Sequence, residues 1–200
     1  MKVIGLCGGS GSGKGAVCDI LSERFIPSID TDRVYHRITS EDSPCLRELV
    51  GAFGESIIDS NGALDRSVLR NIVFGTVDAE KKRKTLNEIA HKHILAETRR
   101  IIAEKRGQGA IAVIVDAPLL YESGFDKECD VTVCVVADES VRIDRIVQRD
   151  GISVEDAKKR IRGQISCEEL ICRSDFVLEN NDNIDVLRVK VQDLFDKIIK

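Results

Sequence analysis

A glycine-rich segment directly after an apolar run near the N-terminus constrains this chain more than any other feature. Residues 8–14 read Gly-Gly-Ser-Gly-Ser-Gly-Lys and follow Val3–Leu6, a run typical of a buried strand. The segment matches G-x-x-x-x-G-K, in which glycines let consecutive backbone N–H groups turn toward a phosphate where a Cβ would clash. A helix expected from there to about Arg24 presents its positive end to the same anion. The pattern predicts a phosphate-binding loop between a strand and a helix.

The position after the lysine departs from the common form of this loop. It is usually Ser or Thr, whose hydroxyl binds Mg²⁺, but here it is Gly15, followed by Ala16. We therefore expect Mg²⁺ to be held through ATP and waters, with Asp32 or Asp116 as candidate carboxylates and no hydroxyl ligand at Gly15. Lys14 adds a positive charge that can follow the β- and γ-phosphates during transfer. The ATP-binding residues expected here are Gly9, Ser10, Gly11, Ser12, Gly13, Lys14, Gly15 and Ala16.

Short apolar runs alternate with amphipathic stretches along the rest of the chain. After the first strand, the candidate strands are Ile26–Ile29, Ala110–Val115, Val131–Val136 and Phe176–Leu178. Continuously apolar runs of this length are typical of strands buried on both faces of a parallel sheet. We predict a three-layer α/β fold, with a five-stranded parallel sheet flanked by helices.

Two long stretches carry helical rather than strand patterns. Residues 33–108 show apolar positions at helical spacing from Leu64 onward, and residues 139–170 are helical and rich in arginine. We expect the first to be a helical subdomain inserted between the second and third strands, and the second to be a helical excursion after the fourth strand. The prediction is one domain over 1–200, with a core of about 1–32, 109–138 and 171–200.

Two aspartates follow predicted strands, where ligands bind in parallel sheets. Asp32, in Asp30-Thr31-Asp32, could accept the proton of an attacking hydroxyl, or the pair could cap a helix and close a turn. Asp116 ends the strand that includes Val115 and could support a metal or its waters, although a turn aspartate is equally consistent. Position alone leaves both alternatives open.

Arginines recur on one face of the helical stretch after the fourth strand. Arg142, Arg145 and Arg149 are spaced i, i+3 and i+7, and Arg160 and Arg162 follow an Asp-Gly turn. A solvated face is the default for any one of them. Several arginines after the fourth strand could also close over a polyphosphate and neutralise charge in the transition state.

The overall composition limits the classes of partner that this chain is expected to bind. The formal net charge is −4, from 34 acidic and 30 basic residues, and aromatic residues make up 4% with no tryptophan. This balance disfavours a nucleic-acid binder. No signal peptide or membrane-spanning run is recognisable, and seven cysteines occur without a C-x-x-C pair. We expect a cytoplasmic protein that binds neither nucleic acid nor membrane, as a monomer or weak homo-oligomer.

Several segments, in order along nearly the whole chain, together resemble the dephospho-coenzyme A kinase family. Ile4–Lys14 is similar to the family's G-L-T-G-G-x-G-S-G-K, and Asp116–Glu122 is similar to D-x-P-L-L-F/Y-E. The other matching segments are Ile29–Asp32, Leu64–Arg66, Val73–Phe74, Ile89–His91, Arg145–Gly151, Arg160–Gln164, Ser174–Val177 and Asn180–Asn181. Each motif alone is moderately specific, whereas their order and spacing together are highly specific.

The resemblance implies transfer of the ATP γ-phosphate to the ribose 3′-hydroxyl of dephospho-coenzyme A, the last step of coenzyme A synthesis. It implies that Asp32 orients or deprotonates that hydroxyl and that Lys14 follows the transferring phosphate. It also implies that residues of about 33–108 form an acceptor-binding insertion and that residues of about 139–170 form a lid, from which Arg145 and Arg149 act. The remaining implied residues are Arg66, His91, Asp116 and Leu119 on the acceptor side with Asp32, and Asn180 or Asn181 near the adenine.

Two rival functions stay open on the residues alone. Another small-molecule P-loop kinase could act on a nucleoside monophosphate or a sugar-like alcohol. A phosphate acceptor needs little proton removal, so the Asp30–Asp32 pair favours a hydroxyl acceptor only in part. The second rival is an ATP-binding sensor without phosphate transfer, which has only Gly15 in its support.

Overall fold

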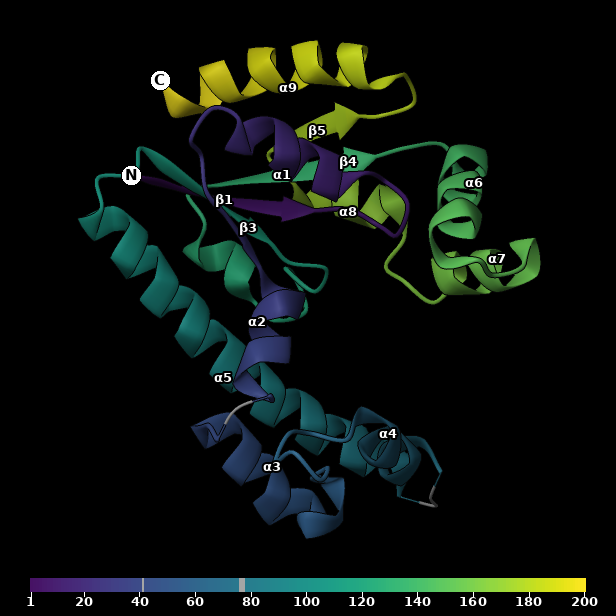
Figure 1. The fold of residues 1–200 in the computed structure, drawn as a ribbon. Coiled ribbons are helices and arrows are strands. Elements are labelled where there is room, and N and C mark those ends of the chain that lie inside the picture. Colours follow the sequence, from purple (N-terminus) through teal and green to yellow (C-terminus); the bar gives the residue numbers. More distant parts are fainter. Residues whose placement is uncertain (41, 76–77) are drawn as a thin grey trace. The chain divides into compact units, whose positions relative to one another are not determined.

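The computed structural model describes residues 1–40, 42–75 and 78–200 (Figure 1). The chain divides into two compact units, one comprising Met1–Ile29 with Ile102–Lys200 and the other Asp30–Ile101. The expected single domain, with its insertion of about 33–108 and its lid of about 139–170, stays a prediction.

The larger unit is built on a parallel sheet. Within the described residues its strands are β1 (Lys2–Cys7), β2 (Ser28–Asp30), β3 (Ala112–Asp116), β4 (Val131–Val136) and β5 (Phe176–Glu179), in the order β2-β3-β1-β4-β5. β1 pairs in parallel with both β3 and β4, and β4 with β5. The predicted five-stranded parallel sheet of an α/β fold is confirmed. Because the order reverses at β1, the loop after β1 leaves the sheet at a topological switch point, where such sheets bind ligands.

The predicted element ends were less accurate than the elements themselves. β2 and β3 begin at Ser28 and Ala112, two residues later than predicted. Helix α1 (Lys14–Ser22) ends before the predicted Arg24. Phe25 adopts a left-handed conformation (φ 59°) and donates its N–H to the carbonyl of Ser22 at 3.0 Å, which closes the helix.

One face of the sheet is covered by α1 and by α9 (Ile184–Ile199), which lie side by side in Figure 1. Their apolar side chains and those of the strands form one cluster, in which Ile4, Val17 and Phe195 are fully buried. The packing of α1 against this face holds the start of that helix, and so the end of the glycine-rich loop, at a constant position.

The opposite face contacts shorter elements, and a pair of helices extends beyond it. The 3₁₀ helix η2 (Phe125–Glu128) contacts β1, and α8 (Cys167–Arg173) contacts β4. The pair comprises α6 (Glu139–Asp150) and α7 (Val154–Arg162), which share a small apolar cluster of Ile143, Ile146 and Ala157. This cluster makes α6 and α7 one structural piece, referred to below as the lid.

The smaller unit is helical. It contains α2 (Thr31–Ile38), α3 (Pro44–Phe53), the 3₁₀ helix η1 (Glu55–Ile57), α4 (Arg66–Phe74) and most of α5 (Ala79–Gly107). Asp30, Ser43 and Asp65 cap the first three α-helices of this unit with their side chains, which explains why each helix begins where it does. Its apolar cluster includes Leu49, Ile57 and Val73, all fully buried. Among the described residues, no helix is long and apolar enough to cross a membrane.

Candidate phosphate-binding and catalytic site

The loop Gly8–Gly13 joins β1 to α1 and depends on glycine for its shape. Gly11 and Gly13 have φ angles of 79° and 97°, which residues with a side chain rarely adopt. A Cβ at Gly13 would also lie 2.1 Å from Nδ2 of Asn180. Gly13 is the N-cap residue of α1, and no side chain hydrogen bond caps this helix. The start of α1 is thus arranged to receive an anion in the place of a capping side chain.

The carbonyl oxygen of every residue from Gly8 to Gly13 accepts a hydrogen bond. The donors are, in order, Lys14 Nζ (2.9 Å), Ser12 N–H (3.1 Å), Arg142 Nε (2.9 Å), Arg145 Nη1 (3.3 Å), Asn180 Nδ2 (2.8 Å) and Val17 N–H (3.3 Å). In a planar trans peptide the carbonyl and the following N–H point in opposite directions. Fixing the carbonyls therefore also fixes the directions of the N–H groups, and an anion meets dipoles that need no reorganisation.

Lys14 and Asp116 meet at the carboxyl ends of neighbouring strands. Nζ of Lys14 lies 3.9 Å from Oδ1 of Asp116, and the side chains are 15% and 18% exposed. β1 pairs with β3 in register from Lys2 with Ala112 to Leu6 with Asp116, which brings the carboxylate to the loop that follows β1. The pair places one positive and one negative charge beside the loop, at a distance that lets either group turn toward a ligand.

Asn180 and Arg145 support the loop from two other elements. Asn180 follows β5, is 4% exposed and donates its side chain to the carbonyl of Ser12. Arg145, on α6, contacts the carbonyls of Gly11 and Ser12 and also Oδ1 of Asn180 at 3.4 Å. Both belong to the predicted site, and the structure brings them to the phosphate loop. The contact of Asn180 is with the backbone of the loop, a role that the sequence did not indicate.

Two lid residues that were absent from the predicted site also contact the loop. Arg142 is 8% exposed and donates from Nε to the carbonyl of Ser10. Gln164 accepts from the Ser10 N–H through Oε1 at 2.9 Å. The spacing of Arg142 with Arg145 was a visible signal in the sequence. Gln164 ends Arg160–Gln164, one of the matching segments in the sequence, but its contact with Ser10, 154 residues away, left no signal there.

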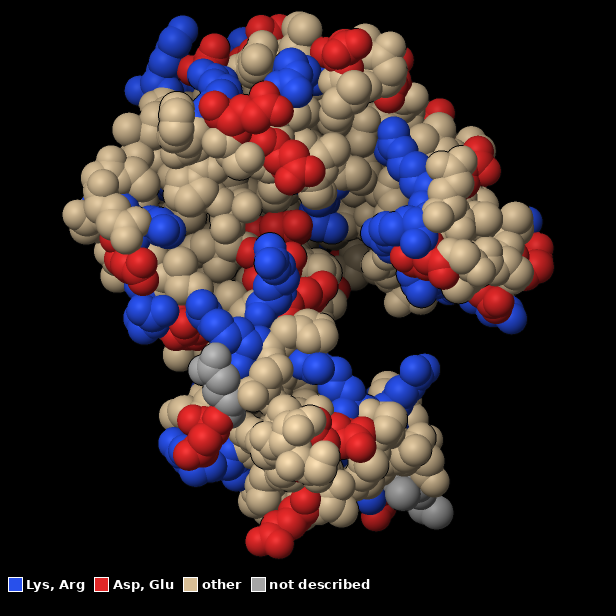
Figure 2. All heavy atoms as spheres, viewed as in Figure 1, with Lys and Arg blue, Asp and Glu red and all other residues tan. Residues whose placement is uncertain are grey.

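Two predicted residues lie in other surroundings. Arg149 forms an ion pair with Asp150 (Nε to Oδ1, 2.8 Å), which also pairs with Arg160. These arginines lower the pKa of the Asp150 carboxyl to about 2. Basic side chains gather where α6 and α7 lie (Figure 2). Asn181 accepts a hydrogen bond from the Asp138 N–H at 2.8 Å and so joins the ends of β5 and β4.

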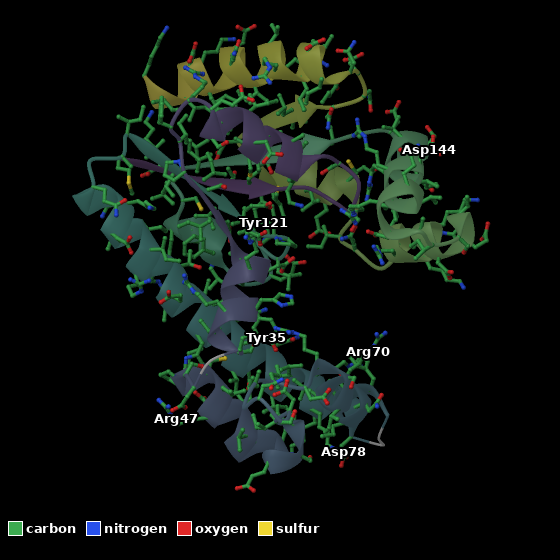
Figure 3. The ribbon with its side chains drawn as sticks, in the orientation of Figure 1. Tyr35, Arg47, Arg70, Asp78, Tyr121 and Asp144 are labelled. Carbon is green, nitrogen blue, oxygen red and sulfur yellow. The ribbon has the colours of Figure 1, made fainter. Side chains whose placement is uncertain are left out.

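The segment after β3 presents Leu119 and anchors Tyr121. Leu119 is exposed, whereas Tyr121 (Figure 3) is buried, with its hydroxyl 2.6 Å from Oγ of Ser174. The guanidinium carbon of Arg173 lies 4.3 Å from the centre of the Tyr121 ring. Ser174 also lies 3.5 Å from the thiol of Cys7, the residue before the phosphate loop. This network fixes the segment in which Leu119 is exposed.

In the helical unit, Asp30 and Asp32 have different surroundings. The carboxylate of Asp30 accepts the Arg33 N–H at 3.0 Å and caps α2. Asp32 lies in the first turn of α2 and is exposed. The capping alternative thus applies to Asp30.

Arg66 and His91 belong to the same unit. Arg66 begins α4 and donates to the hydroxyl of Thr39 at 3.0 Å. Tyr35 (Figure 3), on α2, is half-buried, and burial raises its pKa, an effect that the charge of Arg66 partly offsets. His91 lies half-buried on α5, and the next residue, Lys92, pairs with Glu48 at 2.7 Å. The hydrogen bond to Thr39 therefore holds Arg66 at the start of α4.

Metal-ligand clusters are not a feature of the described residues. Among them, no group of three or more His, Cys, Asp or Glu side chains could hold a metal ion. Gly15 is exposed and brings no hydroxyl, and Asp116 supplies a half-buried carboxylate next to Lys14. A hard cation that takes most of its oxygens from a phosphate ligand and waters fits this set of donors.

Comparison with known proteins identifies the family. The model of the dephospho-CoA kinase family matches residues 2–185. The dephospho-CoA kinase of Fusobacterium nucleatum is 38% identical over 192 residues, which cover 96% of each chain. That of Corynebacterium glutamicum is 37% identical over 99% of this chain and 100% of its own. The solved structure of dephospho-CoA kinase from Campylobacter jejuni superposes with a TM-score of 0.72 at 25% identity, covering 98% of this chain and 96% of that one. A phosphate loop of this geometry and these full-length matches show that the chain belongs to the dephospho-CoA kinase family.

Proposed function

We propose that this chain transfers the γ-phosphate of ATP to the ribose 3′-hydroxyl of dephospho-coenzyme A, giving coenzyme A and ADP. The observation that carries the proposal is the loop Gly8–Gly13, in which every carbonyl accepts a hydrogen bond, in a chain of the dephospho-CoA kinase family. A loop with this arrangement binds polyphosphate through N–H groups that are already oriented. The cytoplasm is the proposed place of action.

In the reaction, the 3′-oxygen forms a bond to the γ-phosphorus while the bond from that phosphorus to the β–γ bridging oxygen breaks. Negative charge grows on the bridging oxygen, which leaves with ADP. We assign Lys14 and Arg145 to the stabilisation of this charge, because both already contact the phosphate loop. Arg149 can join them when it leaves Asp150. Transfer is then favoured by electrostatics that act on the transition state more than on bound ATP.

The proton of the attacking hydroxyl goes to a carboxylate, and Asp32 is the residue assigned to accept it. Asp32 lies two positions beyond the end of β2, and α2 begins around it. Its neighbour Asp30 is already engaged as the helix cap. A base that orients the hydroxyl in line with the γ-phosphorus contributes about 10²- to 10⁴-fold to the rate.

Mg²⁺ is the proposed metal, held mainly by phosphate oxygens and waters, with Asp116 or Asp32 as carboxylate partner. When bound, it neutralises charge on the β- and γ-phosphates. Asp116 lies beside Lys14, so this chain can direct a carboxylate and an ammonium at the same polyphosphate. Gly15 contributes only backbone.

The proposed acceptor residues are Asp32, Arg66 and His91 in the helical unit and Asp116 and Leu119 in the larger unit. Arg66 offers a guanidinium for an acceptor phosphate and is steadied by Thr39. Leu119 offers exposed apolar surface. For ATP, Asn180 and Asn181 are proposed near the adenine, with Asn180 also bracing the loop.

The test is ADP formation from ATP and Mg²⁺ with dephospho-coenzyme A, AMP, adenosine or no acceptor, with the product identified by mass. We expect dephospho-coenzyme A to gain one phosphate. Asp32→Asn should lower kcat by about 10²-fold or more while ATP still binds. Asp30→Asn is the matched control, since asparagine caps helices as well as aspartate does and activity should persist.

Other outcomes select the rivals. If only AMP or adenosine gained a phosphate, the chain would still be a kinase, but its acceptor would not be dephospho-coenzyme A. ATP binding with no acceptor phosphorylated would support a sensor, with the missing hydroxyl at Gly15 as its cause.

A further inference from the structure

Ser10, at the middle of the phosphate loop, has all three of its polar groups bound by the lid. Its N–H donates to Oε1 of Gln164 at 2.9 Å, and its hydroxyl accepts from Nε2 of the same residue at 3.3 Å. Its carbonyl accepts from Nε of Arg142 at 2.9 Å. Two lid residues thus hold one peptide of the loop and its side chain in a single orientation.

The shape of the loop provides an independent observation. A Cβ at Gly9 would lie 2.4 Å from Nη2 of Arg142 and 3.3 Å from Oε1 of Gln164. The lid side chains therefore pack so closely on the loop that a residue larger than glycine at position 9 would displace them. Close packing and three hydrogen bonds coincide at the same place.

The lid can transmit this contact because its parts are rigidly connected. Gln164 lies two residues after the end of α7, and its N–H donates to the carbonyl of Ile161 at 3.2 Å. Arg142 lies on α6, and α6 and α7 share the cluster of Ile143, Ile146 and Ala157. A movement of the lid therefore moves both side chains that hold Ser10.

We propose that Gln164 and Arg142 form a clamp on Ser10 that keeps the phosphate loop in its ATP-binding shape and couples it to the lid. Gln164 is a positioning residue, since it acts through the backbone of Ser10. Arg142 is buried and adds positive charge behind the loop. The inference rests on the proposed function only in that the loop binds ATP, and it does not depend on the acceptor.

The experiment measures ATP binding directly, by titration calorimetry with Mg²⁺ and no acceptor, on the full chain. Gln164→Ala removes two neutral hydrogen bonds from an exposed side chain and should raise the Kd for ATP about three- to tenfold. Gln148→Ala is the matched control, because Gln148 is an exposed glutamine on α6 of the same lid, and its Kd should equal that of the wild type. Thermal unfolding of both variants checks that the fold is intact.

A double-mutant cycle isolates the pair. Ser10→Ala removes the hydroxyl contact and keeps the Cβ, and Gln164→Ala should weaken ATP binding less in that background than in the wild type. In steady state, the KM for ATP should rise for Gln164→Ala while the KM for the acceptor stays constant.

Two results would contradict the proposal that Gln164 and Arg142 clamp Ser10. One is an unchanged or tighter ATP Kd for Gln164→Ala, which would mean that Gln164 is idle or competes with the phosphate. The other is strict additivity of the effects of Gln164→Ala and Ser10→Ala on the ATP Kd. If the wild type itself bound no ATP, the proposed function would fail first, so the two failures are distinguishable.

Discussion

The side chain of Asn180 donates a hydrogen bond to the carbonyl of Ser12 at 2.8 Å and so joins the end of β5 to the phosphate loop, 168 residues away in the sequence. Asn180→Ala would leave that buried carbonyl with only the long contact from Arg145. We expect a loss of about 1–3 kcal/mol in the free energy of unfolding, and weaker ATP binding. Denaturant unfolding and calorimetry measure the two effects.

A second substitution at the same position sharpens this prediction. Asn180→Asp cannot donate to the carbonyl of Ser12 and adds a negative charge beside a polyphosphate site, so ATP binding should fall further than in Asn180→Ala. Equal ATP affinities in the wild type and both variants would show that the bond to Ser12 does not support the site.

Gly15 allows a direct test of the missing hydroxyl. A Cβ built at this position meets no atom within 4 Å, and Gly15 lies in the first turn of α1. Gly15→Ser should therefore fold normally and lower the Mg²⁺ concentration needed for half-maximal activity several-fold, because a hydroxyl becomes available to the metal. The activity is followed as a function of Mg²⁺ at saturating ATP.

The control for this substitution is Gly15→Ala, which adds the Cβ and its helical preference without the hydroxyl. Both variants should be more stable than the wild type by about 0.4–1 kcal/mol, since the unfolded chain loses freedom. If Gly15→Ser and Gly15→Ala changed the Mg²⁺ requirement equally, the cause would be the backbone of α1 and not metal coordination by the hydroxyl.

The ion pairs of Asp150 predict acid sensitivity of the lid. Arg149 and Arg160 hold the pKa of Asp150 at about 2, below its usual 3.8. A carboxyl whose pKa is lowered on folding stabilises the folded state above the unfolded pKa and loses that contribution as the pH falls through the folded value. The difference in unfolding free energy between the wild type and Asp150→Asn should be constant above about pH 5 and disappear toward pH 2.

The matched control is Asp144→Asn, an exposed aspartate on the same helix (Figure 3). The difference in unfolding free energy between the wild type and Asp144→Asn should show no such decline between these pH values. A decline of equal size in both variants would mean that net charge, and not the pairs of Asp150, causes the acid sensitivity.

Thiol labelling provides a check on the core. Burial raises the pKa of both Cys18 and Cys129 to about 12, and a protonated thiol is a poor nucleophile. Cys172 is exposed. With iodoacetamide at pH 8, Cys172 should be alkylated first, and Cys18 and Cys129 should be alkylated only on unfolding. Peptide mass spectrometry would show the order. Labelling of Cys18 as fast as Cys172 would contradict the packing of α1.

Local patterns were enough to predict the fold and the position of the phosphate loop. The run Val3–Leu6, the glycines and Lys14 are adjacent in sequence, and the alternation of apolar runs with helical stretches implies a parallel sheet. The order of the strands could not be obtained in this way, because it depends on which strands pair across long loops. The ends of α1 and β3 were also missed by a few residues, since hydrogen bonds at helix and strand ends decide them.

The sequence by itself therefore determined the class of fold, the anion-binding loop and, through ordered motifs, the kinase family. Only the tertiary structure decided which side chains hold that loop in shape. Asn180, Arg142 and Gln164 reach it from three separate elements, and Arg149 pairs with Asp150 instead. The physical reason is that a carbonyl or N–H group of the loop can be satisfied by any partner within about 3 Å, whatever its position along the chain, so these contacts leave no periodic trace in the sequence.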